Sequence, residues 1–157
     1  SVNLGKCFTD WEKIPLTKKI DTLNMPIKIE NFNNGIAVNV GNPHIVFFGQ
    51  NIEKVNLHQI GPEIENHELF PNKTNVEIIE IINKQQIKMR VWERGVGITL
   101  ACGSGACAAV YAGMLKNFLD KKVEVILEKG SLYIEIINDE AIMSGPAQIS
   151  FQGNIEI

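Results

Sequence analysis

A cysteine followed by a glycine-rich turn is the feature of this chain most suited to chemistry. Cys102 precedes Gly103-Ser104-Gly105, and residues 101–116 are rich in alanine and predict a helix. A thiol at a helix N-terminus loses its proton more easily, because the free backbone N–H groups there carry partial positive charge. The same N–H groups can bind a carboxylate or a phosphate. We therefore expect a thiolate beside a bound anion, although a buried, inert cysteine at a tight turn fits the residues alone equally well.

Ser104 follows this cysteine by two residues and has two possible uses. A nucleophilic serine in a sharp glycine turn has a glycine two positions before it, and here that position is Cys102. We therefore expect Ser104 to cap the helix, or to donate a hydrogen bond to a bound anion, rather than to attack a substrate. The turn also lacks the Gly-Lys-Ser/Thr ending of a phosphate-binding loop, so no nucleotide site is expected.

Two charged residues lie just before the glycine turn. Glu93 and Arg94 are neighbours, and Arg94 is one of only two arginines in the chain, with Arg90. Neighbouring side chains of a regular strand point to opposite faces, so both reach one site only if the strand bends, as Gly95 and Gly97 permit. The alternative is an exposed charge pair that contributes little to stability.

A histidine and an asparagine are further candidates. His44 follows Asn42-Pro43 and precedes the apolar residues 45–48, which predict a buried strand. An imidazole there can transfer protons, but a single histidine is more often a structural hydrogen-bond donor. Asn75 is either a turn residue or a group that hydrogen-bonds a substrate, and the residues alone favour the turn.

Composition limits the classes of function. The chain has 157 residues, 45% of them hydrophobic, and a formal net charge of −3. We expect one domain over residues 1–157 with a sizeable core and no basic surface for nucleic acid or anionic lipid. No apolar run is long enough to cross a membrane. The three cysteines (Cys7, Cys102 and Cys107) have neither disulfide-framework nor metal-ligand spacing, which favours a cytoplasmic protein without a metal.

The predicted elements are mainly short strands. Asn33-Asn34-Gly35 indicates a hairpin, and alternating or continuous apolar residues indicate strands on either side of it. Helices are expected over residues 56–66 and 101–116. The expected strands cover residues 26–30, 35–41, 45–48, 74–82, 86–93, 121–128, 131–138, 141–144 and 148–157. Many short strands and one small-residue helix predict an α+β fold in which the sheet curls around that helix.

Together these segments resemble the diaminopimelate epimerase family. The segments that carry the resemblance are Gly41-Asn42-Pro43-His44, Thr74-Asn75-Val76-Glu77, Trp92-Glu93-Arg94-Gly95 and Thr99-Leu100-Ala101-Cys102-Gly103-Ser104-Gly105-Ala106. With Val2-Asn3-Leu4-Gly5 and Met143-Ser144-Gly145-Pro146-Ala147, the resemblance covers nearly the whole chain in order, but only the second half of the family's pattern. The first half, with its own cysteine motif, is absent.

The resemblance implies two similar halves, each a curled, largely antiparallel, barrel-like sheet around a central α-helix. It also implies a cofactor-independent epimerase that interconverts LL- and meso-diaminopimelate, in the biosynthesis of lysine and peptidoglycan precursors. One cysteine removes the α-proton of the substrate, and a second cysteine returns a proton on the opposite face. This chain would supply one of the two cysteines and be inactive alone.

The resemblance also implies a role for each matching residue. Cys102 matches the acid/base of the second half, and His44 and Glu93 match residues beside the reacting carbon. The residues expected to bind the substrate are Asn42, Asn75, Glu93, Arg94, Gly103 and Ser104.

The expected partners are a small amino-diacid and the missing N-terminal half, and we also consider a homodimer. Two alternatives are a racemase or isomerase of the same fold with another substrate, and a non-catalytic module that binds an anion.

Overall fold

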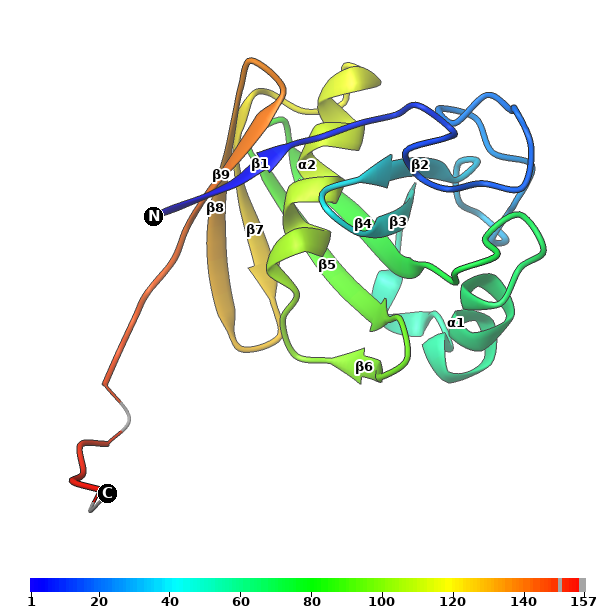
Figure 1. The fold of residues 1–157 in the computed structure, drawn as a ribbon. Coiled ribbons are helices and arrows are strands. Elements are labelled where there is room, and N and C mark those ends of the chain that lie inside the picture. Colours follow the sequence, from blue (N-terminus) through cyan, green and yellow to red (C-terminus); the bar gives the residue numbers. More distant parts are fainter. Residues whose placement is uncertain (150, 156–157) are drawn as a thin grey trace.

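The described chain, residues 1–149 and 151–155 of a computed structural model, forms one strongly curved sheet with a helix inside the curve (Figure 1). The strands of this part of the chain are β1 (Val2–Lys6), β2 (Ile36–Asn39), β3 (Pro43–Gly49), β4 (Asn75–Asn83), β5 (Gln86–Glu93), β6 (Gly97–Thr99), β7 (Lys122–Leu127), β8 (Gly130–Ile137) and β9 (Glu140–Ser144). Their order is β1-β9-β8-β7-β5-β4-β3-β2, and β6 pairs with β5 outside this path. The pairs β3/β4 and β5/β7 are parallel and the others are antiparallel.

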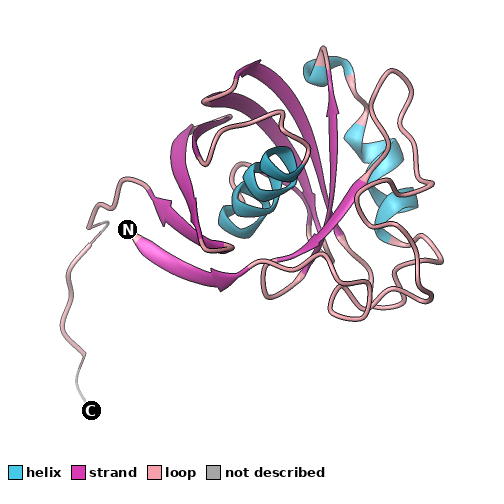
Figure 2. Ribbon diagram, turned by 90° about the horizontal axis from the view of Figure 1, so that it is seen from above, coloured by secondary structure: helices cyan, strands magenta, loops and turns pink. Residues whose placement is uncertain are grey.

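The helix α2 (Gly103–Leu115) lies inside the curve of the sheet (Figure 2). Its residues from Gly105 to Gly113 are all buried, and most are glycine or alanine. A helix that is apolar on all sides must be covered on all sides, and small side chains let the strands approach its backbone closely. At Gly113, a Cβ would lie only 2.4 Å from a side-chain carbon of Leu119. The predicted α+β fold, a largely antiparallel sheet curled around a central helix, is confirmed.

The opposite face of the sheet is covered by a second apolar cluster. The helix α1 (Leu57–Glu65) and the 3-10 helix η1 (Ile52–Lys54) contribute to this cluster, together with Phe47 and Ile78 of the sheet. No helix in residues 1–149 and 151–155 is long and apolar enough to cross a membrane.

Alternation along each strand decides which side chains reach α2. On β3, Val46 and Phe48 belong to the apolar cluster around α2, whereas Ile45 and Phe47 belong to the cluster around α1. Side chains two positions apart share a face of a strand. His44 therefore faces α2.

Most of the predicted elements are present, with ends that differ from the prediction by no more than two residues. Two strands were not predicted. Four of the five residues of β1 are exposed, so this edge strand has no apolar pattern. The strand β6 has only three residues and lies between glycine turns.

The strand predicted over residues 26–30 is wrong, and so is the hairpin at residues 33–35. The apolar residues of this segment contact the cluster around α1 without joining the sheet, as Ile27 does. Pro26 has no N–H to donate to a neighbouring strand. A backbone hydrogen bond from Gly35 N to Ile27 O joins the two sides of the expected hairpin, but only one side is a strand.

The strand predicted over residues 148–157 is also wrong for the residues of this segment that the structure describes. Residues 148–149 and 151–155 form no strand and lead away from the sheet (Figure 1). Residues 150 and 156–157 lie outside the described residues. In the described part of the chain, the apolar side chains of this segment have no neighbouring strand to cover them: Ile149, Phe151 and Ile155 are each more than three-quarters exposed.

Candidate active site

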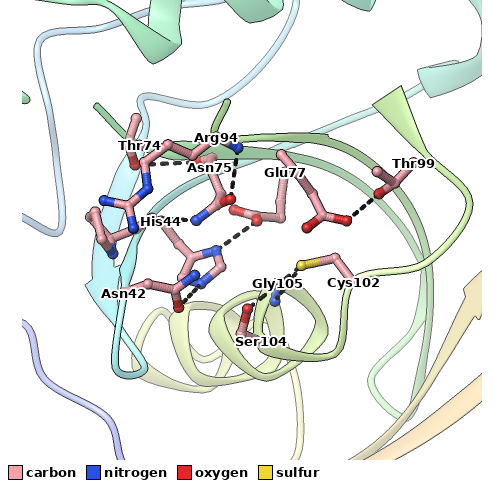
Figure 3. A network of polar contacts seen from close by, with 12 residues as sticks. Asn42, His44, Thr74, Asn75, Glu77, Arg94, Thr99, Cys102, Ser104 and Gly105 are labelled. Carbon is pink, nitrogen blue, oxygen red and sulfur yellow. Dashed lines mark hydrogen bonds and ion pairs between the residues drawn. The ribbon is translucent and has the colours of Figure 1, made fainter. Parts of the chain in front are cut away.

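Polar side chains from three neighbouring strands meet the N-terminus of α2 (Figure 3). On β4, Ile79 packs in the cluster around α2, so Glu77, two residues before it, points to the same side. On β5, Val91 packs in that cluster and Glu93 follows it by two residues. Together with His44 on β3, these carboxylates lie on the helix side of the sheet. The fold thus brings together residues that are far apart in the sequence.

Cys102 is the N-cap residue of α2. Its backbone is extended, with φ −141° and ψ 109°, and its Sγ accepts a hydrogen bond of 3.3 Å from the backbone N–H of Gly105. The hydroxyl of Ser104 lies 3.6 Å from the same sulfur. Gly105 must be small, because a Cβ there would lie 2.7 Å from Glu77 Oε1 and 3.2 Å from the sulfur. The predicted position of the cysteine at a helix N-terminus is confirmed.

The predicted lowering of the pKa of Cys102 is wrong for this chain. Burial raises the pKa of the thiol to about 11, and the nearby carboxylate of Glu77 adds to the rise. The hydrogen bonds from Ser104 and Gly105 act in the opposite direction but do not outweigh the loss of solvent. Cys102 is only 7% exposed. Near neutral pH the group is therefore a neutral thiol.

His44 is completely buried and has a hydrogen-bond partner at each ring nitrogen. Its Nδ1 lies 2.7 Å from Glu77 Oε1, and its Nε2 lies 2.8 Å from Asn42 Oδ1. The amide oxygen of Asn42 can only accept, so Nε2 carries a proton. Asn42, His44 and Glu77 therefore form one continuous hydrogen-bonded line (Figure 3).

Glu77 was not among the predicted site residues. It is fully buried, and its Oε2 has no hydrogen-bond partner among the described residues. The signal that could have identified it is a charged residue inside an otherwise buried strand, because buried charges need partners. The partner could not be inferred from that signal, since it depends on the parallel pairing of β3 with β4.

Asn75 connects two strand ends. Its Nδ2 donates to Pro43 O at 2.8 Å, and its Oδ1 accepts from the backbone N–H of Arg94 at 2.9 Å. The side chain is 4% exposed. Both ends of the amide are therefore engaged with backbone groups, which places the start of β3 against the end of β5.

The strand β5 ends at Glu93, and the chain then turns. Gly95 and Gly97 have φ values of 76° and 106°, which favour glycine, so the bend needed to bring both charged residues to one site is present. Glu93 Oε1 accepts a hydrogen bond from the hydroxyl of Thr99, a site residue that was not predicted. Arg94 is exposed, and its Nη1 donates to the backbone carbonyl of residue 72 at 3.1 Å.

The buried carboxylate of Glu65, on α1, stabilises this turn through hydrogen bonds. Glu65 accepts hydrogen bonds from Trp92 Nε1 at 2.7 Å and from Gly95 N at 2.9 Å, and Lys73 Nζ lies 3.5 Å away. Burial acts to raise the pKa of Glu65, but these two donors and the positive charge of Lys73 leave it lowered. Sequence reasoning did not identify Glu65, because it lies far along the chain from the residues it holds.

The first turn of α2 provides the groups suited to an anion. The backbone N–H groups of Gly103 and Ser104 are in the first turn of the helix, where no intrahelical acceptor exists. Side-chain atoms of Met143, on β9, approach Gly103 closely enough to fill the position of a Cβ, at 2.8 Å. A separate groove of about 990 Å³, lined by residues 28–33 and by parts of β3 and α1, contains none of the candidate site residues.

Residues 36–150 match the family model described as diaminopimelate epimerase. A curated protein named diaminopimelate epimerase from Wolbachia sp. subsp. Drosophila simulans (strain wRi) is 46% identical over 139 residues, which cover 88% of this chain and 53% of that protein. Another of that name from Pelagibacter ubique (strain HTCC1062) is 46% identical over 160 residues, covering 98% of this chain and 58% of that protein. The chain thus spans about half the length of the curated relatives it matches.

A solved structure of a Bacillus anthracis phenazine biosynthesis protein of the PhzF family is 16% identical to this chain, with a TM-score of 0.45. The match covers 64% of this chain and 33% of that chain.

Proposed function

The chain belongs to the diaminopimelate epimerase family, and we propose that it forms the C-terminal half of an enzyme that interconverts LL- and meso-diaminopimelate. The observation that carries the proposal is the position of Cys102, whose sulfur lies at the N-terminus of α2 among hydrogen-bonded polar groups. The N-terminal half of that enzyme would supply a second cysteine. We further propose that the chain is inactive alone and that the whole enzyme is cytoplasmic and needs no cofactor.

The proposed chemistry is a two-cysteine exchange of the α-hydrogen. One thiolate removes the proton from the α-carbon, and the electron pair stays on that carbon and its carboxylate. The thiol on the opposite face then gives its proton to the carbon, which inverts the stereocentre and exchanges the roles of the two sulfurs. The raised pKa of Cys102, about 11, supports a first role as proton donor.

The first turn of α2 would bind the α-carboxylate of the substrate. The free N–H groups of Gly103 and Ser104, together with the helix dipole, favour an anion at this place. Negative charge that develops on the carboxylate as the proton leaves would be stabilised by the same groups. Binding and catalysis would thus share one set of donors, placed beside the thiol of Cys102.

Charged and amide groups around the thiol would bind the rest of the substrate. Arg94 uses one N–H for the backbone carbonyl of residue 72, so its other N–H groups can bind the distal carboxylate. Glu93 accepts from Thr99 with one oxygen and can accept from a substrate ammonium with the other. Asn42 uses its oxygen for His44, which leaves its NH₂ group for the substrate. Asn75 would act mainly by positioning Arg94.

A chimera tests this function. This chain replaces the matching C-terminal segment of the Pelagibacter ubique relative, and inversion of LL-diaminopimelate is followed by chiral chromatography, with exchange of the α-hydrogen in D₂O. We expect both reactions in the chimera and neither above the buffer rate in the isolated chain. A chimera that unfolds cooperatively on heating but does not invert the substrate contradicts the proposed function. Turnover by the isolated chain contradicts the requirement for a second half.

A further inference from the structure

Glu77, a buried acidic residue of the candidate active site, lies close to both His44 and Gly105. Glu77 Oε1 lies 2.7 Å from His44 Nδ1 and also 2.7 Å from the position that a Cβ of Gly105 would occupy. Cys102 Sγ lies 3.2 Å from that same position. The carboxylate of Glu77 is therefore a near neighbour of the sulfur across Gly105, and it also contacts His44 (Figure 3).

The charge of this carboxylate is balanced by one group. Glu77 is fully buried, and its Oε2 has no hydrogen-bond partner among the described residues. His44 Nε2 donates to Asn42 Oδ1, so a proton on Nδ1 makes His44 a cation facing Glu77 Oε1. The pair is then neutral overall, and its negative member is the group that lies against Gly105.

Two other titratable groups lie near Cys102, but one is partly exposed and the other is uncharged at neutral pH. Glu93 on β5 is partly exposed, and its carboxylate is engaged by the hydroxyl of Thr99. Cys107, further along α2, is buried and uncharged at neutral pH, because burial raises its pKa to about 12. Glu77 is thus the fully buried acidic group next to the thiol.

We propose that Glu77 is a positioning residue that, in addition to burial, disfavours the thiolate of Cys102, by holding a carboxylate, fixed by His44, against the N-terminus of α2. The role of the thiol as first proton donor rests on the proposed function. In that role, the second cysteine must be the one that starts as a thiolate. The resting enzyme is then ready for the stereoisomer whose α-hydrogen faces the second cysteine.

The first test measures how fast iodoacetamide alkylates Cys102 as a function of pH. The intact 157-residue chain is used, and the modified peptide is quantified by mass spectrometry, so that Cys7 and Cys107 do not interfere. We expect Glu77→Gln to move the midpoint of reactivity to lower pH by about one unit, which raises the rate near pH 8 about tenfold. The amide oxygen of glutamine can still accept from His44 Nδ1, so the hydrogen bond and the packing are kept while the negative charge is lost.

Glu80→Gln is the matched control. Glu80 is on the same strand, but its side chain faces away from α2 and accepts from the backbone N–H of Ile52 at 3.3 Å. This variant should keep the wild-type midpoint. An unchanged midpoint in Glu77→Gln overturns the proposal, and so does an equal shift in the control.

The second test needs no folded variant at residue 77. With ¹⁵N-labelled histidine in the wild-type chain, NMR reports whether each ring nitrogen of His44 carries a proton, and substitutions of His58 and His67 assign the three histidines. We expect Nδ1 of His44 to carry a proton, as Nε2 does, because the carboxylate of Glu77 at 2.7 Å can only accept. A bare Nδ1 overturns the proposal.

Both measurements are made without substrate and without the second half of the enzyme. An inactive chimera would therefore refute the epimerase function without touching the alkylation result. An unshifted alkylation midpoint would refute the role of Glu77 and leave the epimerase function standing.

Discussion

The side-chain oxygen of Asn75 accepts a hydrogen bond of 2.9 Å from the backbone N–H of Arg94, while its NH₂ group donates to Pro43 O. One buried amide thus joins the beginning of β3, which carries His44, to the turn that presents the only exposed guanidinium near the site in the described residues. The positions of His44 and of the Arg94 guanidinium are therefore coupled through one buried side chain.

Asn75→Ala should loosen this connection. Two backbone groups would lose their partner in a buried place, so we expect the free energy of unfolding in urea to fall by about 1–3 kcal/mol. In the chimera, KM should rise more than kcat falls, because Arg94 would be misplaced. The control is Asn72→Ala, which keeps the backbone carbonyl that accepts from Arg94. Equal stability of the two variants would contradict the positioning role.

Glu65→Gln should weaken the turn in a pH-dependent way. The pKa of Glu65 is lowered in the folded chain, so its contribution to stability is present above the carboxyl's unfolded pKa of about 4.3 and is lost as the pH falls through the folded value. Urea titrations should show Glu65→Gln less stable than wild type near pH 7, with the difference shrinking toward pH 3. A difference that is the same at both pH values would contradict the ionised carboxylate as its cause.

The buried thiols should make the protein sensitive to alkali. Burial raises the pKa of Cys102 to about 11 and that of Cys107 to about 12, whereas unfolded thiols ionise near pH 8.5. The stabilisation is complete below that pH and is lost as the pH rises toward the folded values, by up to about 1.4 kcal/mol per pH unit for each thiol. We expect the free energy of unfolding in urea to fall between pH 9 and pH 11. In Cys107→Ala, the free energy of unfolding should fall less steeply with pH, because one buried thiol no longer contributes. An unchanged slope would show that Cys107 is not a source of the pH dependence.

Gly105→Ala tests whether the higher helix propensity of alanine outweighs the steric contacts of an added Cβ. Alanine favours a helix by about 1 kcal/mol over glycine, but a Cβ here would lie 2.7 Å from Glu77 Oε1 and 3.2 Å from Cys102 Sγ. We expect a net loss of stability in urea and an altered alkylation rate of Cys102. Ser104→Ala, which adds no atom, should change stability less. A gain of stability in Gly105→Ala would show that the carboxylate moves away easily.

Much of the fold follows from local patterns. The alanine-rich residues of α2 and the apolar runs of β3 to β5 predict their own structures, because burial requires those residue types at those spacings. The same patterns failed at residues 26–30, where apolar side chains fill a core without a strand. They also missed β1, whose exposed residues carry no apolar signal.

The site is less accessible to sequence reasoning than the fold is. That His44 and Glu93 face α2 follows from alternation once the strands are known. The contact between Glu77 and His44 does not, because it depends on the register that pairs His44 with Asn75 in a parallel ladder. The raised pKa of Cys102 was also not predictable, since it comes from burial and from Glu77 rather than from the helix end.

The most direct test of the proposed chemistry is Cys102→Ala in the chimera with the Pelagibacter ubique N-terminal half. Stereoinversion of LL-diaminopimelate is measured at saturating substrate, and cooperative thermal unfolding shows that the variant is folded. Loss of an acid/base group should reduce the rate by about 10²–10⁴-fold. A folded variant that inverts the substrate as fast as the unmodified chimera would contradict the role of Cys102.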